Sequence, residues 1–182
     1  MAGIGPEDLH ELVEEMLAAD VEALNTIPTF AAELAGAPAR AFPSPGIPVW
    51  DCCEQLTVHV DGIGENATSP AGLATGRRHV HGRINLPGLI TTVTRCVPVV
   101  GGTQLDALPS IESMTAAARQ INADGWALWN HIYNMLQGGT LLARCHEVYW
   151  EGLRAVAPSG GCGGWVLTLR VQLDGYEEIL GS

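Results

Sequence analysis

The first hydrophobic pattern along the chain has the period of an α-helix. From Pro6 onward, large apolar residues recur every three or four positions with glutamates on the opposite side: Leu9, Leu12, Val13, Met16, Leu17 and Leu24. Pro6 followed by Glu7 and Asp8 is typical of a helix start, because acidic side chains favour the positive end of the helix dipole. The pattern predicts a helix over residues 6–26. Asp20 falls within the apolar arc, so we expect this helix to be only partly buried.

Alternating patterns downstream predict strands. A proline-rich connector over residues 28–48, expected to be a short helical turn and then extended chain, leads into a strand over Trp50–Asp61. In that strand Leu56, Val58 and Val60 alternate with polar residues, which predicts one buried face. After a loop over Gly62–Gly76, Arg78–Val97 is expected to form one long strand or a pair of strands.

The last third of the chain predicts a closing hairpin. Its two strands are expected over Leu142–Ala157 and Gly164–Leu173, where apolar and polar residues alternate around Trp165, expected in the core. Between them, the glycine-rich segment Pro158–Gly164 predicts a flexible loop. Residues 176–182 are expected to form a frayed tail.

The clearest single element is a helix over Pro109–Gln137. Ser110 is a good N-cap, and Gly138 with Gly139 provides a stop. Steps of three and four mark a stripe that we expect to cover the sheet: Ile111, Met114, Ala118, Ile121, Gly125, Leu128 and Ile132. In the second half, Trp126, Trp129 and Tyr133 widen the apolar arc to roughly 160°. That excess needs a cover, either from the N-terminal helix or from another subunit, so these three residues are the interface candidates.

The order of elements favours one fold class. A helix, two or three strands, a second helix and two more strands predict an α+β fold with a mostly antiparallel sheet of four to five strands flanked by two helices. The 182 residues fit a single domain. Within it we expect the N-terminal helix at 6–26, the connector at 28–48, the sheet and central helix at 49–175, and the tail at 176–182.

Composition and charge narrow the possible functions. The formal net charge is -11, and the nine cationic residues are all arginine and scattered, which disfavours a nucleic-acid-binding surface. No apolar run reaches the ~20 residues that a membrane helix needs, and the N-terminus lacks the pattern of a signal peptide. The expectation is a soluble protein without a membrane partner. Five cysteines, an odd number, are therefore expected to be free thiols in a reducing compartment.

The sequence offers few candidate residues for a catalytic or metal-binding site. Cys52, Cys53, His59, His79, His81, Cys145 and His146 are the possible metal ligands, but their spacing does not match structural zinc sites. A Cys–His nucleophilic site with Cys52 or Cys145 attacking and His59 or His81 as base stays open as an alternative, although strand cysteines are more often core residues. The glycine-rich segment precedes a strand and lacks lysine, so it does not match a phosphate loop. We expect no catalytic residue, no metal and no cofactor.

Three segments carry a resemblance to a known family. The Trp50-Asp-Cys-Cys-Glu-Gln-Leu-Thr-Val58 strand, the strand from Leu89 to Pro98 and the Trp126-Ala-Leu-Trp129 helix resemble head-to-tail connector proteins of long-tailed, siphovirus-type phages that infect actinobacteria. The nearest likeness is to the tail terminator, the ring that caps the tail tube and joins it to the head. The resemblance spans roughly residues 5–175 in element order. Its motifs are short and non-catalytic.

The resemblance implies a structural virion protein of the phage neck. It implies a homomeric ring, a hexamer for terminators, that is assembled in the host cytoplasm and contacts the major tail tube protein and other neck proteins. DNA would pass through the lumen without specific binding, which the acidic charge suits. Another neck ring (adaptor or stopper) is the nearest alternative. A Cys–His hydrolase or transferase and an acidic adaptor or inhibitor that mimics nucleic acid are the alternatives from other classes.

Overall fold

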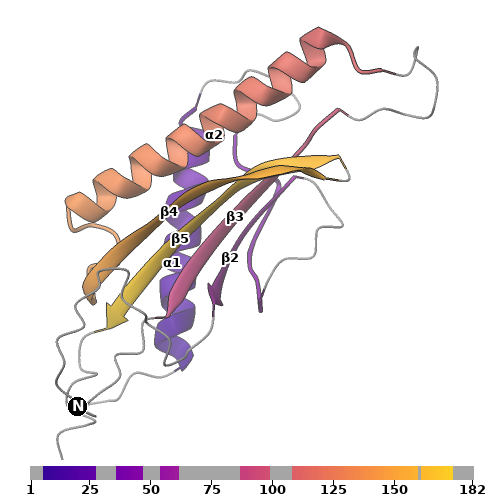
Figure 1. The fold of residues 1–182 in the computed structure, drawn as a ribbon. Coiled ribbons are helices and arrows are strands. Elements are labelled where there is room, and N and C mark those ends of the chain that lie inside the picture. Colours follow the sequence, from indigo (N-terminus) through magenta and orange to yellow (C-terminus); the bar gives the residue numbers. More distant parts are fainter. Residues whose placement is uncertain are drawn as a thin grey trace, which may run out of the picture.

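The chain folds into two helices and a five-stranded sheet, an α+β arrangement (Figure 1). The structure is a computed structural model that describes residues 6–27, 36–46, 54–61, 87–98, 108–159 and 161–173. The elements in chain order are α1 (Pro6–Asn25), β1 (Arg40–Pro43), β2 (Gln55–Asp61), β3 (Gly88–Cys96), α2 (Ile111–Gln137), β4 (Cys145–Ser159) and β5 (Cys162–Leu173). The predicted fold class is confirmed.

The strand order is β1-β2-β3-β5-β4. All neighbouring strands pair antiparallel except β1, which runs parallel to β2 with Arg40 opposite Gln55. Strand β1 lies in the segment predicted to be a connector, so that prediction is wrong over residues 40–43. The sequence did not reveal β1 because four residues in a proline-rich segment are too short to show an alternating pattern. Its pairing partner, β2, also lies further along the chain. The other residues of the connector lie partly outside the described ranges.

Several predicted boundaries are corrected. Strand β2 begins at Gln55, after Glu54, and β3 begins at Gly88, after Pro87. Residues 50–53 and 78–86 of the two predictions lie outside the described ranges, as do the Gly62–Gly76 loop and the tail. The predicted loop at Pro158–Gly164 is shorter than expected. Strand β4 continues to Ser159, and β5 begins at Cys162, which is the register partner of Ser159. Cross-strand pairing therefore overrides the glycine-rich local sequence.

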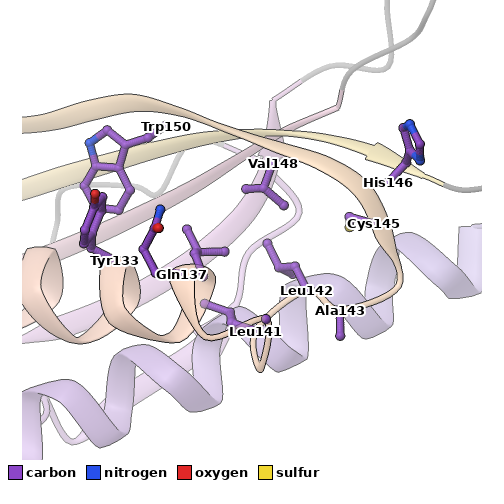
Figure 2. A pocket seen from close by; sticks show the side chains of 11 residues that line it. Tyr133, Gln137, Leu141, Leu142, Ala143, Cys145, His146, Val148 and Trp150 are labelled. Carbon is purple, nitrogen blue, oxygen red and sulfur yellow. The ribbon is translucent and has the colours of Figure 1, made fainter.

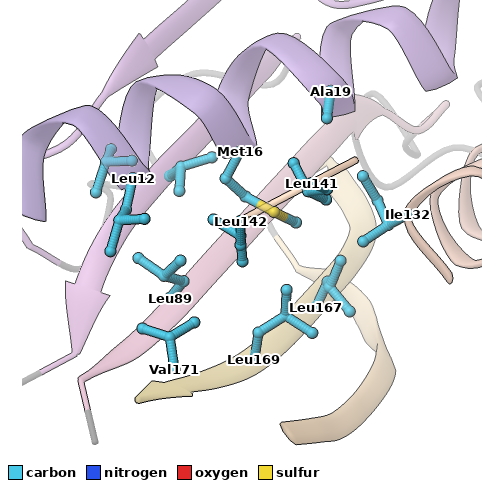
Figure 3. Packing of buried hydrophobic residues seen from close by; sticks show 12 residues of the cluster. Leu12, Met16, Ala19, Leu89, Ile132, Leu141, Leu142, Leu167, Leu169 and Val171 are labelled. Atoms are coloured by element: carbon cyan, nitrogen blue, oxygen red, sulfur yellow. The ribbon is translucent and has the colours of Figure 1, made fainter. Parts of the chain in front are cut away.

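Both helices cover one face of the sheet and form the core with it (Figure 3). On this face α1 contributes Leu12 and Met16, and α2 contributes Ile132. The strands supply their alternate residues: Val58, Leu89, Leu167, Leu169 and Val171. A second cluster joins Ala23 and Leu24 of α1 to the sheet, together with Leu56, Val93 and Leu128. The predicted α1 helix and its apolar stripe are confirmed.

Three ionisable side chains, Asp20, Arg95 and Asp124, lie inside this helix–sheet layer. Asp20 of α1 is fully buried and accepts a hydrogen bond from Thr91 Oγ1 at 2.6 Å, so the expected partial burial of α1 at this position is wrong. Burial raises the pKa of Asp20 to about 8, against the opposing effect of the Thr91 hydrogen bond. Arg95 of β3 is buried against α2, where its Nε donates to Asp124 Oδ2 at 2.8 Å.

The N-terminal half of α2 does not bury the predicted stripe. Ser110 caps the helix as predicted, with its side chain accepting from the Ser113 amide. However, Ile111 and Met114 are exposed, and the buried side consists of Ala117, Gln120, Asp124, Gly125, Ala127, Leu128 and Ile132. The cause is the buried Arg95: Asp124 must turn inward to pair with it, and Gln120 Nε2 donates to Asp124 Oδ1 at 3.2 Å. This ion pair sets the rotation of the first half of the helix.

The opposite side of β2 is also buried, so the prediction of a single buried face is wrong there. Gln55, Thr57 and His59 are each nearly inaccessible, although α1 and α2 lie on the other face. The Thr57 hydroxyl and both ring nitrogens of His59 have no hydrogen-bond partner among the described residues. Burial lowers the pKa of His59, with Asp61 opposing the shift, so this ring is held neutral.

Candidate assembly interface

An aromatic row runs along the outer side of the second half of α2. The ring centroids of Trp126 and Trp129 lie 5.4 Å apart, and Trp129 stacks on Tyr133 with centroids 5.5 Å apart and planes 8° from parallel. Trp150 of β4 extends the row, with its ring edge-on to Tyr133 at 6.3 Å. We call Trp126, Trp129, Tyr133 and Trp150 the aromatic row.

The three helix members of the aromatic row are open to solvent. Trp126 is 66% exposed, Trp129 38% and Tyr133 41%. From the sequence we considered that either α1 or another subunit would cover these three residues. Helix α1 does not bury them, because it packs beside the opposite, buried side of α2. Large aromatic side chains are costly to leave in water and are enriched at protein interfaces. Among the described residues, nothing covers the row.

A close contact on the inner side fixes which residues point outward. Trp165 of β5 lies against Gly125, where a Cβ atom would overlap its indole ring. The indole Nε1 donates to the Ile121 carbonyl at 2.6 Å. Trp165 is half-buried beside the second core cluster, in agreement with its predicted core position. Because the glycine lets α2 approach the sheet here, Trp126 is directed away from it.

The outer side of α2 carries no exposed carboxylate after its first turn. Between Ser113 and Gln137 the sole acidic residue is Asp124, which is buried against Arg95. The contrast with α1 is clear, since its exposed positions include Glu7, Glu11, Glu14 and Glu22. Interface cores are depleted in charged residues and enriched in Trp, Tyr and Met. After its first turn, the outer side of α2 carries one exposed charged residue, Arg119, beside its Trp and Tyr residues, in a chain whose net charge is -11.

The aromatic row ends in a groove of mixed polar and apolar lining. Figure 2 shows Tyr133 and Trp150 at one end of this groove and Cys145 and His146 at the other. Its volume is about 310 Å³, and its walls come from the end of α2, the 138–144 turn and the start of β4. The apolar lining is Leu136, Leu141, Leu142 and Val148, and none of the eleven lining residues is Asp, Glu or Arg. The groove therefore continues the surface without carboxylates beyond the helix.

The alternative chemical sites do not form among the described residues. No cluster of His, Cys, Asp and Glu able to hold a metal is present in the described ranges. Cys145 and His146 border the groove, whereas His59 is buried without any hydrogen bond, so a Cys145–His59 pair is not formed. The remaining candidates, Cys52, Cys53, His79 and His81, lie outside the described residues.

The prediction of five free thiols is wrong at Cys162. This residue is disulfide-bonded, while Cys96 and Cys145 form no disulfide. Cys162 opens β5, opposite Cys96 of β3 in the register. Five cysteines are compatible with one or two disulfides, but the spacing of the cysteines in the sequence does not show which of them form one.

The sequence identified part of this surface. The widened apolar arc pointed to Trp126, Trp129 and Tyr133, and the structure places all three in one contiguous row. It missed Trp150 and the groove, because these come from β4, whose position beside the end of α2 depends on the sheet order. It also assigned Ile111 and Met114 to the core, where the structure exposes both.

Comparisons with known proteins add no family to these observations. No protein-family model matches the chain, and a search of curated proteins finds no match. Neither described helix has the length and apolar character needed to cross a membrane.

Proposed function

We propose that this chain is a structural subunit that assembles with its own copies into a ring. The observation that carries the proposal is the exposed, stacked aromatic row on a helix side without carboxylates. Elsewhere an acidic chain repels its own copies, whereas this side, which has no carboxylate after the first turn of α2, lets two of them approach without repulsion between carboxylates. A buried aromatic cluster is the usual anchor of a strong interface.

The resemblance to head-to-tail connectors gives the ring its proposed place. We propose the neck of a long-tailed phage, with the tail terminator as the leading assignment and an adaptor or stopper ring as the alternative. The α+β fold agrees with what the resemblance implies. The glutamates on the exposed side of α1 offer a surface to which passing DNA does not adhere, because like charges repel.

Substitution of Trp129 tests the assembly proposal. Trp129→Ala removes the centre of the aromatic row, which contacts both Trp126 and Tyr133. Loss of an interface anchor typically costs about 2–4 kcal/mol of binding free energy. We expect a folded subunit that no longer assembles, measured by sedimentation velocity together with thermal unfolding.

Asn134→Ala is the matched control. Asn134 is exposed on the same helix, about 140° around the axis from Trp129, and its side-chain amide donates to Asn130. This variant should assemble like the wild type. A Trp129→Ala protein that assembles normally, or one that loses its own fold, would contradict the proposed role of the row.

A further inference from the structure

Two cysteines face each other across the pairing of β3 and β5. Cys96, the last residue of β3, is the register partner of Cys162, the first residue of β5. Cys162 is disulfide-bonded and buried, whereas Cys96 forms no disulfide and is exposed. The sheet therefore places a cysteine thiol opposite a cysteine that already takes part in a disulfide.

The hydrogen bonds around this pair define its geometry. The Val97 amide donates to the Gly161 carbonyl at 2.7 Å. The Cys96 amide donates instead to Glu54 Oε1 at 2.8 Å, on the side of β3 that faces β2. Because hydrogen-bonded and non-hydrogen-bonded pairs alternate along antiparallel strands, Cys96 and Cys162 form a non-hydrogen-bonded pair.

A pair of this kind has the dimensions of a disulfide. In a non-hydrogen-bonded pair the Cα atoms lie about 4.5 Å apart, and both side chains point to the same face of the sheet. The Cα atoms of disulfide-bonded cysteines lie about 4.4–6.8 Å apart. A bond between Cys96 and Cys162 therefore fits the sheet without a change in strand register.

We propose that the thiol of Cys96 exchanges with the disulfide of Cys162. The Cys96 thiolate attacks Sγ of Cys162, and the Cys96–Cys162 bond forms. The bond between Cys162 and its present partner breaks, and the partner sulfur leaves with the electron pair and takes up the proton that Cys96 has released. One disulfide and one thiol are present before and after the step, so it consumes no oxidant and no reductant.

Position distinguishes Cys96 from Cys145, the other described cysteine that forms no disulfide. Cys145 pairs with Leu173 at the far end of β5 from Cys162. Strand β5 has 12 residues, so its two ends lie about 35 Å apart. Cys145 cannot reach Cys162 across that distance within the folded chain.

The exchange changes which parts of the chain are covalently joined. A Cys96–Cys162 bond joins β3 to β5, which already pair along the whole of β3. The cysteine that Cys162 now holds becomes a thiol, and the covalent restraint that its bond imposed is lost. The pair is thus a covalent switch within one subunit, and it operates whether or not the subunit assembles into a ring.

Disulfide mapping of the wild-type protein tests the exchange. The protein is purified without reductant, held at pH 8, denatured in acid and treated with N-ethylmaleimide, and the linked peptides are identified by mass spectrometry. Two linkages of Cys162 should be found, one to its present partner and one to Cys96. Cys96→Ser should lose the second linkage completely and should fold, because position 96 is exposed. Cys145→Ser is the matched control and should keep both linkages.

The wild-type result alone decides the proposal, without reliance on a substitution. A single linkage of Cys162 after prolonged incubation, with Cys96 recovered fully alkylated, would overturn the exchange. Disulfide-linked dimers through Cys96, in place of the bond within one chain, would also overturn it. So would a Cys162 that is itself recovered as an alkylated thiol, because no disulfide would then be present to exchange.

Discussion

Asp20 lies in the apolar arc of α1, yet its carboxyl group is fully buried beneath the sheet. One oxygen accepts from Thr91, and the other has no partner among the described residues. A buried carboxyl group of this kind is less costly when protonated, which is why its pKa rises to about 8. The sequence marked Asp20 as an irregularity, but its burial depends on β3, which supplies Thr91 from 71 positions away.

The raised pKa of Asp20 predicts a pH-dependent stability. At pH values between 3.8, the ordinary pKa of this carboxyl group, and about 8, the carboxyl group of Asp20 is protonated in the folded state and ionised in the unfolded state. The free energy of unfolding should therefore fall as pH rises, by at most about 1.4 kcal/mol per pH unit from this group. Asp20→Asn lacks the titration, so its stability relative to the wild type should improve from pH 5 to pH 8. Urea unfolding at both pH values measures this, and a pH-independent difference between the two proteins would contradict the burial of a protonated Asp20.

Arg95 is a second buried ionisable residue, and its hydrogen bonds connect several segments of the fold. It bonds to Asp124 through Nε and Nη2, to Glu54 through Nη1 and to the Gly36 carbonyl. Burial acts to lower the pKa of Arg95, but the two carboxylates outweigh it and raise the pKa, so the guanidinium stays charged. One side chain thereby joins β3 to α2 and to two segments that precede β2.

Removal of Arg95 should therefore be costly. Arg95→Met leaves Asp124 buried without its cation, which typically costs about 3–5 kcal/mol of unfolding free energy. The double variant Arg95→Met with Asp124→Leu removes the stranded charge as well and should recover much of that loss. Guanidinium unfolding of the three proteins gives the values. A neutral effect of the single substitution, or a double variant no more stable than the single, would show that the ion pair does not hold α2 in place.

At the scale of elements, the sequence predicted what local periodicity controls. Both helices, the Ser110 cap and the Leu56–Val58 face of β2 follow from spacing alone. Strand β1 and the inward rotation of α2 at Gln120 and Asp124 could not be predicted, because their causes are partners distant in sequence. The same holds for the candidate site. Its helix residues were visible in the arc, whereas Trp150 and the groove depend on where β4 lies.

The contact between α2 and β5 gives a prediction for Gly125. A methyl group there would overlap the Trp165 indole, and such overpacking costs about 1–3 kcal/mol. The gain in helix propensity from Gly to Ala is about 1 kcal/mol, so Gly125→Ala should have a lower melting temperature. Gly46→Ala is the matched control, because nothing lies within 4 Å of its added Cβ, and its melting temperature should not fall. A Gly125→Ala protein as stable as the wild type would contradict the packing of α2 on Trp165.

For the whole molecule, the exposed sides of the two helices differ in charge and in residue type. The exposed side of α1 is acidic, while the exposed side of the second half of α2 carries the aromatic row and no carboxylate. The inner faces of both helices are used by the core. Under the proposed function, copies of the subunit would repel one another at the acidic side and join along the second half of α2.

The mass of the purified wild-type protein tests the central claim most directly. Native mass spectrometry across a range of protein concentrations, with negative-stain electron microscopy of the same sample, gives both stoichiometry and shape. We expect one dominant closed homomeric ring, with six copies if the terminator assignment holds, which dissociates to folded monomers when Trp129 is replaced by alanine. A wild-type chain that remains monomeric at every concentration, while folded and with its aromatic row exposed, would contradict the claim.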